Sequence, residues 1–213
     1  MPPLATHRDA MKRIVLASGN PGKVRELQGL LKETGIQVIP QSEYCVPDAE
    51  ETGLSFIENA ILKARHACRH TDLPALADDS GLEVDFLDGE PGIYSARYAG
   101  SHGDDVANND RLLGELDGVP EAERTARFRC VIALLRHAED PMPLVVSGTW
   151  EGRILTQPRG DGGFGYDPLF FDRELGRSAA ELDARTKNRH SHRGRALQAL
   201  LAALRAEPAR LSG

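Results

Sequence analysis

The sequence predicts an α/β fold. Three observations carry this prediction: a strand, loop, helix and strand follow one another near the N-terminus, later helices start with capping signals, and two long strand patterns come after them. The 213 residues are 40% hydrophobic and 27% charged, with a net charge of −6. This composition is ordinary for a globular protein and excludes a disordered chain, a collagen-like repeat and a membrane protein.

The N-terminal elements follow from short-range patterns. The apolar run Ile14–Ala17 predicts a buried strand that ends in the small-residue loop 18–22. Apolar residues then recur at helical spacing over 24–31, and Gly35 is the expected C-terminal cap of that helix. Ile36–Ile39 completes the unit as a second strand.

The middle of the chain alternates between helix and strand signals. Ser55 and Glu58 form a capping-box pattern that opens a helix. The apolar residues 75–77 predict a short buried strand that runs into residues 78–81, and the alternation in 82–86 predicts a half-buried strand after them. Residues 104–116 predict another helix.

The last third predicts a hairpin, a loop and a final helix. Residues 128–135 and 144–155 predict two longer strands that form an antiparallel pair. The glycine-rich segment 160–167 predicts a loop before the apolar strand 169–171, and the last helix starts near Ser191 with an apolar stripe.

Cysteine usage and the chain ends bear on compartment and domain number. The three cysteines are odd in number and widely spaced, as expected for reduced thiols in the cytoplasm rather than for a disulfide framework.

We expect residues 1–11 to be a flexible lead-in, 12–205 to be one domain and 206–213 to be a short tail. The sequence carries no signal-peptide or membrane-span pattern, and its net charge argues against a nucleic-acid binder.

A small-residue loop lies between the first strand and the first helix, and it is the first candidate site. Backbone N–H groups at a helix start, with a lysine beside them, form a phosphate site. It is not a P-loop, because Val24 follows the lysine. A plain turn with a solvated lysine explains the loop equally well. The loop residues are Ser18, Gly19, Asn20, Pro21, Gly22 and Lys23.

Acidic residues gather in two windows, 46–59 and 72–90, which hold eleven carboxylates and no lysine or arginine. We expect a compact acidic block, in which most single acids are simply solvated. Asp78 and Asp79 differ because they follow a buried strand, at the edge where α/β proteins place ligands. Adjacent carboxylates repel unless a cation or a proton compensates them, and oxygen ligands favour Mg²⁺ or Mn²⁺.

Two further segments suit a nucleotide. The loop 160–167 fits GxGxxG literally, but no helix follows, so a dinucleotide site is rejected. Phe164 or Tyr166 offers a flat face to a base, unless both rings belong to the core.

Basic residues dominate 184–206, where Ser191 opens the last helix and its neighbours can donate to an anion or a carbonyl. A solvated basic turn is the alternative. Together these segments indicate a nucleoside triphosphate pocket.

Five ordered motifs resemble those of the inosine/xanthosine triphosphate pyrophosphatase family. They lie at 18–23, 49–60, 77–82, 162–168 and 191–193. The resemblance implies a two-lobed α/β fold with a long, twisted, mixed sheet and a cleft between the lobes. It also implies a homodimer, dependence on Mg²⁺, and hydrolysis of ITP, dITP, XTP or dXTP to the monophosphate and pyrophosphate.

The resemblance also implies roles for individual residues. Asp79 would be the proton acceptor and a metal contact, supported by Asp78, and Glu50 a second metal contact, with Glu51 as the alternative. The loop 18–23 would hold the triphosphate. The remaining substrate contacts would be Lys63, Ser80, Phe164, Gly165, Tyr166, Asp167, Lys187, His192 and Arg193.

Two other functions compete with this one. A related house-cleaning pyrophosphatase would act on pyrimidine or modified nucleotides, whereas donors at His192 and Arg193 favour a purine with a C6 carbonyl. A nucleotide-sensing module would need the same pocket without a catalytic carboxylate, and the intact Asp78-Asp79 pair argues against it. How GTP is rejected, and whether the α or β phosphorus is attacked, stay open at this point.

Overall fold

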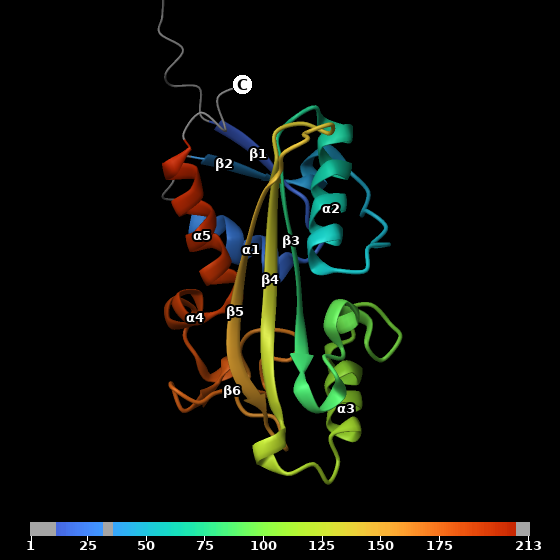
Figure 1. The fold of residues 1–213 in the computed structure, drawn as a ribbon, viewed down its shortest axis with the longest axis vertical. Helices are drawn as coiled ribbons and strands as arrows, with labels where there is room; N and C mark the ends of the chain where they lie inside the picture. Colours follow the sequence, from blue (N-terminus) through green and yellow to red (C-terminus); the bar gives the residue numbers. More distant parts are fainter. Residues whose placement is uncertain (1–11, 32–35, 208–213) are drawn as a thin grey trace, which may run out of the picture.

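The computed structural model describes residues 12–31 and 36–207, and the strands among them form one mixed sheet of seven strands (Figure 1). Their order is β2-β1-β3-β4-β5-β6-β7. β1 runs parallel to β2 and β3, and the remaining neighbours are antiparallel. The strands are β1 (Lys12–Leu16), β2 (Ile36–Pro40), β3 (Ala75–Val84), β4 (Thr125–Leu135), β5 (Leu144–Ile154), β6 (Phe170–Asp172) and β7 (Arg177–Ser178). The predicted α/β class with a long mixed sheet is confirmed.

Helices cover both faces of the sheet where it is formed by β1, β3 and β4. Figure 1 shows α1 and α5 on one side and α2 on the other. The helices are α1 (Pro21–Leu31), α2 (Phe56–Thr71), α3 (Asp105–Glu115), α4 (Ala184–His190) and α5 (His192–Ala206). The short 3₁₀ helices are η2 (Gln41–Tyr44), η3 (Asp85–Leu87), η4 (Gly92–Arg97), η5 (Glu121–Glu123) and η6 (Ala179–Glu181).

Side-chain caps start the helices where the sequence places Ser and Asp. The Ser55 hydroxyl accepts the N–H of Glu58 at the start of α2, and Ser191 accepts the N–H of Gly194 at the start of α5. The predicted end of α1 at Gly35 lies outside the described residues, as do 1–11 and 208–213. None of the helices in the described ranges has both the length and the apolar character needed to cross a membrane.

Three buried clusters give the molecule its two lobes. One cluster lies between the sheet and α1 and α5, and a second lies between the sheet and α2. The third fills the other lobe around Trp150 and Phe170, at the far ends of β4 and β5. Trp150 donates its indole N–H to Asp172 at 2.7 Å, which satisfies the only polar group of that ring. The long strands β4 and β5 therefore run through both lobes.

The strands expected at 75–77 and 82–86 are not separate. β3 is continuous, and β4 pairs with each of its residues from Ala75 to Val84. β1, by contrast, pairs with β3 only as far as Leu76. Asp78 and Asp79 are therefore in mid-strand, but they lie just beyond the carboxyl end of β1, where that side of β3 is open. The two aspartates therefore follow the end of β1 and not the end of β3.

Two further differences have local causes. Residues 184–190 form the helix α4, whereas the sequence patterns predict no helix there and a solvated basic turn was one alternative for this segment. The Asp183 carboxylate accepts the N–H of Thr186 at 2.9 Å and caps this helix. The predicted alternating strand 82–86 is only the end of β3, because Asp85 and Phe86 already belong to η3.

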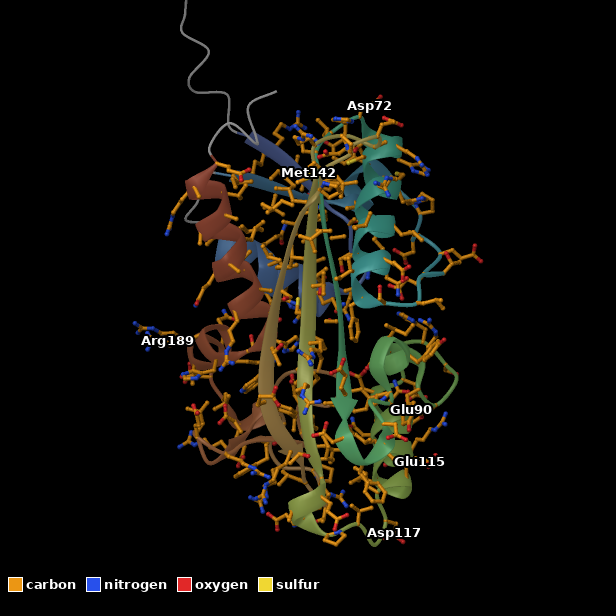
Figure 2. The ribbon with its side chains drawn as sticks, in the orientation of Figure 1. Asp72, Glu90, Glu115, Asp117, Met142 and Arg189 are labelled. Carbon is orange, nitrogen blue, oxygen red and sulfur yellow. The ribbon has the colours of Figure 1, made fainter. Side chains whose placement is uncertain are left out.

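The acidic windows do not form one block. Figure 2 shows Asp72 and Glu90 far apart along the long axis of the molecule. Two other members face arginines of β4 instead: Glu83 lies 2.9 Å from Arg129, and Asp85 lies 2.8 Å from Arg127. Only the acids near the end of β1 can act together, so the expectation of a compact acidic block was wrong.

Candidate active site

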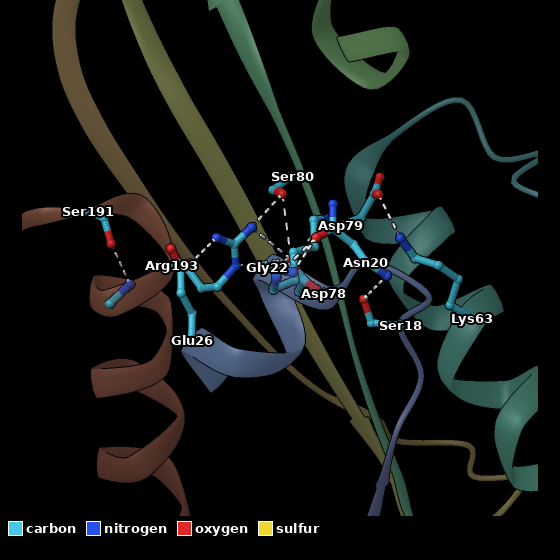
Figure 3. Close-up of polar contacts among 12 residues, drawn as sticks. Ser18, Asn20, Gly22, Glu26, Lys63, Asp78, Asp79, Ser80, Ser191 and Arg193 are labelled. Atoms are coloured by element: carbon cyan, nitrogen blue, oxygen red, sulfur yellow. Dashed lines mark hydrogen bonds and ion pairs between the residues drawn. The ribbon is translucent and has the colours of Figure 1, made fainter. Parts of the chain in front are cut away.

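Asp78 and Asp79 lie on opposite faces of the sheet because side chains alternate along a strand. On the face of α1 and α5, Asp78 lies 3.2 Å from the Lys23 ammonium and 3.3 Å from the Arg193 guanidinium. On the face of α2, Asp79 lies 2.8 Å from the Lys63 ammonium (Figure 3). Cations therefore compensate the two adjacent carboxylates, and the nearest cations of each lie on its own face of the sheet.

The two carboxylates have opposite pKa shifts. Burial alone would raise the pKa of Asp78, but Lys23, Arg193 and Lys63 outweigh it and hold that pKa well below its ordinary value. Burial raises the pKa of Asp79, and the attraction of Lys63 and Lys23 only partly offsets it. Within the described part of the chain, the buried Oδ2 of Asp79 has no hydrogen-bond partner. Asp79 is thus the more basic carboxylate and has an oxygen free to accept.

Lys63 of α2 joins Asp79 to the segment before that helix. Its ammonium lies 2.8 Å from Asp79 and 2.9 Å from Glu51, and the second oxygen of Glu51 lies 3.3 Å from Arg97. Burial by itself would lower the pKa of Lys63, but the surrounding carboxylates raise it, so this lysine stays charged. The structure therefore brings Glu51 beside Asp79, whereas the side chain of Glu50 is exposed.

The carboxylates near the end of β1 fit part of the ligand shell of a divalent cation. Asp79 offers its unpaired buried oxygen, and Glu50 and Glu51 stand on the neighbouring segment. Residues 12–31 and 36–207 contain no group of three or more His, Cys, Asp or Glu side chains arranged to hold a metal. Mg²⁺ is usually held by one or two carboxylates together with phosphates and water, so this donor set suits it.

The loop 18–23 caps its own helix. The side-chain oxygen of Asn20 accepts the N–H of Gly22 at 2.8 Å and that of Lys23 at 3.1 Å. The N–H of Asn20 in turn donates to the Ser18 hydroxyl at 3.3 Å. The N–H groups of Asn20, Gly22 and Lys23 are therefore engaged within the loop, and the Lys23 ammonium is the charge that the loop presents. Gly19 of the same loop lies directly against Asp48.

An ion-pair chain connects α1 with α4 and α5. Glu26 lies 3.3 Å from Lys187 and 2.5 Å from Arg193. Lys187 also lies 2.6 Å from Asp167, whose carboxylate accepts the N–H of Phe164 at 2.8 Å. Burial raises the pKa of Asp167 despite the nearby Lys187. This series of ion pairs holds the glycine-rich loop against α4 and α5.

Only one of the two aromatic rings of the glycine-rich loop faces the site. Phe164 is half-buried, with the Lys187 ammonium 4.9 Å and the Arg193 guanidinium 5.7 Å from its ring centre. Tyr166 is 4% exposed and belongs to the core of the other lobe, where its hydroxyl donates to the Ser95 carbonyl at 2.9 Å. The expectation that Tyr166 could stack on a base was therefore wrong, since packing holds its ring inside. Gly165 between them is tied to α3, because its N–H donates to Asp105 at 2.7 Å.

His192 and Arg193 are more buried than the sequence suggests. His192 is 6% exposed and stacks on Phe128 at a centroid distance of 4.7 Å. Burial, helped by Arg193 and Lys187, lowers its pKa far below the ordinary value, so its ring is neutral. Arg193 is 2% exposed and also donates to the Ser80 hydroxyl at 3.1 Å. Its guanidinium is therefore mostly committed to protein partners.

Sequence reasoning missed two side chains of this site. Glu26 follows Lys23 by three residues on α1, and residues three apart share a helix face, so this spacing could have identified it. Arg97 reaches Glu51 from η4, and nothing in the sequence pattern connects these segments, which lie 46 residues apart. Both supply charge that holds predicted site residues in place.

Comparison with known proteins gives consistent matches over almost the whole chain. A sequence model of the Ham1 family matches residues 14–203. The chain is 62% identical to a dITP/XTP pyrophosphatase of Thioalkalivibrio sulfidiphilus over 189 residues, which cover 89% of this chain and 96% of the relative. It is 59% identical to a dITP/XTP pyrophosphatase of Vibrio parahaemolyticus over 199 residues, which cover 93% of this chain and 100% of the relative.

Solved protein structures also match this chain over most of its length. A HAM1 protein from Coxiella burnetii superimposes with a TM-score of 0.85 at 50% identity, covering 92% of this chain and 100% of the other. A nucleoside-triphosphatase, dITP/XTP pyrophosphatase from Mycobacterium abscessus does so with a TM-score of 0.71 at 45% identity, covering 90% and 99%.

Proposed function

Because the chain belongs to the Ham1 family, we propose that it hydrolyses the non-canonical purine nucleotides dITP and XTP, with ITP and dXTP, to the monophosphate and pyrophosphate. The observation that supports this most strongly is Asp79. It is a buried carboxylate with a raised pKa and an unpaired oxygen, beside two lysines that can face a triphosphate. A base among cations is what a water-dependent attack on phosphorus requires.

The proposed chemistry divides between the two faces of β3. Asp79 orients a water and takes its proton, while Lys63 holds the carboxylate in place. Lys23 lies at the phosphate loop, where it offsets negative charge that develops on the leaving pyrophosphate. A bound Mg²⁺ or Mn²⁺ would add charge neutralisation at the phosphates, and Asp79 with Glu50 or Glu51 would hold it.

The nucleobase is proposed to rest on Phe164, near the last two helices. Hypoxanthine and xanthine present a carbonyl at C6, where adenine presents an amino group, so N–H donors favour the former. Lys187 is close to that ring. Among the described residues, Arg193 donates twice to Asp78 and once each to Glu26 and Ser80, which leaves one of its five N–H groups for a base. The neutral His192 ring has one N–H to donate. Guanine shares the C6 carbonyl, so its rejection needs a contact at C2.

The function is tested by incubating the purified protein with ITP and Mg²⁺. We expect IMP and pyrophosphate in equal amounts, whereas release of IDP and orthophosphate would contradict the proposal. ATP should be hydrolysed at least about 100-fold more slowly, because adenine meets donors where it has no acceptor. Parallel assays with dTTP and UTP test the competing pyrimidine-directed activity, which requires one of these to be the better substrate.

Phe164 is tested by replacing it with alanine. We expect the KM for ITP to rise about tenfold with kcat changed less than about threefold, since stacking on an aromatic ring stabilises a bound base by about 1–3 kcal/mol. Tyr166→Phe is the matched control, because it removes only the bond to Ser95 in the core. It should lower Tm and leave the KM unchanged; a larger KM effect for Tyr166→Phe than for Phe164→Ala would reverse the assignment.

The remaining partner and compartment proposals follow the family resemblance and composition. We propose a homodimer that acts on small-molecule nucleotides and does not bind nucleic acid, given the net charge of −6. We propose the cytoplasm as its compartment, which agrees with three cysteines that carry no disulfide.

A further inference from the structure

We propose that Asn59 is a positioning residue that sets where the acidic loop, residues 50–53, stands relative to Asp79. Asn59 lies in the first turn of α2 and its side chain is 0% exposed. Its amide oxygen accepts the N–H of Gly53 at 2.8 Å. The inference rests on the proposed function, since it concerns the residues that would bring a carboxylate to the metal and the phosphates.

The last residue of the loop and the residue that follows it are both held by side chains in the first turn of α2. Beside the bond from Gly53 to Asn59, the N–H of Leu54 donates to the Glu58 carboxylate at 2.9 Å. The Ser55 hydroxyl donates to the same carboxylate oxygen at 2.8 Å. Hydrogen bonds to the first turn of α2 therefore set the path of the backbone that leads into this helix.

Asn59 and Lys63 act on the loop from one helix face. They are four residues apart, so they lie one above the other on α2. Asn59 binds the loop through the backbone of Gly53, and Lys63 binds it through the carboxylate of Glu51 at 2.9 Å. Because Lys63 also lies 2.8 Å from Asp79, the Gly53 contact fixes the distance between the loop carboxylates and the proposed catalytic base.

Residue 53 must be glycine because there is no room for a Cβ atom at this position. A Cβ placed on Gly53 would lie 2.7 Å from the Asn59 amide oxygen and 2.7 Å from Cβ of Glu58. Contacts this short force something to move, and the exposed loop can move more easily than the helix. An alanine at residue 53 should therefore release the loop without changing Asn59 itself.

The burial of Asn59 argues that it is not kept for stability. In the described part of the chain its amide nitrogen is buried and has no hydrogen-bond partner. A buried unpaired donor destabilises the folded state, so an apolar side chain of similar branching should be tolerated. Gly53 is only half-buried, so water can satisfy its N–H once the asparagine is gone.

The test compares Asn59→Leu and Gly53→Ala with the wild type, using Gly114→Ala as the control. Gly114 is an exposed helix glycine with nothing within 4 Å of an added Cβ. In both test variants we expect hydrogen exchange over residues 49–56 to rise in the metal-free protein, as local opening does when a loop anchor is lost. The Mg²⁺ concentration for half-maximal ITP hydrolysis should rise about tenfold, as when a residue that orients a metal ligand is lost.

Further results separate positioning from catalysis and from folding. At saturating Mg²⁺, kcat should stay within about twofold of wild type, because no group that touches substrate has changed. Asn59→Asp keeps the acceptor oxygen and should keep exchange over 49–56 slow. If Asn59→Leu fails to fold, Gly53→Ala decides alone.

Unchanged exchange and unchanged Mg²⁺ dependence in Gly53→Ala overturn the proposal, and so does an equal effect of Gly114→Ala. The exchange measurement needs no activity. A wild-type protein that does not hydrolyse ITP therefore contradicts the proposed function and leaves the loop anchor to be judged separately.

Discussion

Asp79→Asn should reduce kcat for ITP hydrolysis by about 10²–10⁴-fold, the range expected when a general base is removed. Asparagine has the same shape and can still accept from Lys63, which lies 2.8 Å away, but it cannot take a proton from water. ITP binding, measured by calorimetry with Ca²⁺ in place of Mg²⁺, should be largely retained. Turnover close to wild type would remove Asp79 from the mechanism.

The control for this variant is Asp72→Asn. Asp72 is an exposed acid that ends α2, and its φ of 53° lies in the left-handed region, which asparagine adopts readily. It makes the same chemical change far from the site. Activity and Tm should both stay at wild-type values.

The pH dependence should identify the same carboxylate. Asp79 must be ionised to accept a proton, and burial raises its pKa above the ordinary 3.8, with Lys63 opposing that shift. Activity is therefore present above the pKa of Asp79 and lost as pH falls through it. Lys63→Met removes the main opposing cation, so the acid limb of kcat/KM should move to higher pH. A limb that stays in place would indicate that another group titrates.

The sequence predicted elements well where the signal was local. The strand before the loop 18–23 and the helix capped by Ser55 both formed as expected, because each depends on apolar spacing or a cap within one segment. The length of β3 was not predictable in this way. Its continuation through Asp78 and Asp79 depends on pairing with β4, whose matching residues Ile132 and Val131 lie about 50 positions further along.

Local sequence signals also could not predict how individual side chains of the site are oriented. Residue type and motif order identified Phe164 and Tyr166 together, but not which ring would face the nucleotide. The answer depends on Gly165, whose φ of 61° turns the chain between them. The role proposed for Asn59 has a similar explanation, since the group that it binds is the backbone N–H of Gly53, and the residue type of Asn59 does not indicate that partner.

Arg193 is the residue whose loss should affect stability most. Its guanidinium contacts Asp78 at 3.3 Å, Glu26 at 2.5 Å and Ser80 at 3.1 Å, and thereby joins α5 to β3 and α1. Arg193→Ala leaves Asp78 buried with fewer cations and creates a cavity. Removing one partner of a buried ion pair costs about 3–5 kcal/mol of unfolding free energy, and we expect a loss of that size together with loss of ITP hydrolysis.

The matched control is Arg195→Ala on the same helix. Arg195 is exposed and donates to the Thr149 carbonyl at 2.7 Å, so its loss should cost no more than about 1 kcal/mol. Unfolding in urea at pH 7 measures both variants. If Arg193→Ala and Arg195→Ala lose equal unfolding free energy, the buried ion pairs of Arg193 do not stabilise the fold more than an exposed hydrogen bond does.

The pH dependence of stability distinguishes the loss of this ion pair from the loss of packing alone. The folded-state pKa of Asp78 lies well below its unfolded value, so its stabilising contribution is present above that unfolded value and disappears as pH falls through the folded one. Without Arg193 the folded-state pKa of Asp78 must rise, because one of its main cations is gone. The deficit of Arg193→Ala should therefore be large at pH 7 and shrink as pH falls below the ordinary aspartate pKa of 3.8. A deficit that stays constant with pH would assign the whole effect to the cavity.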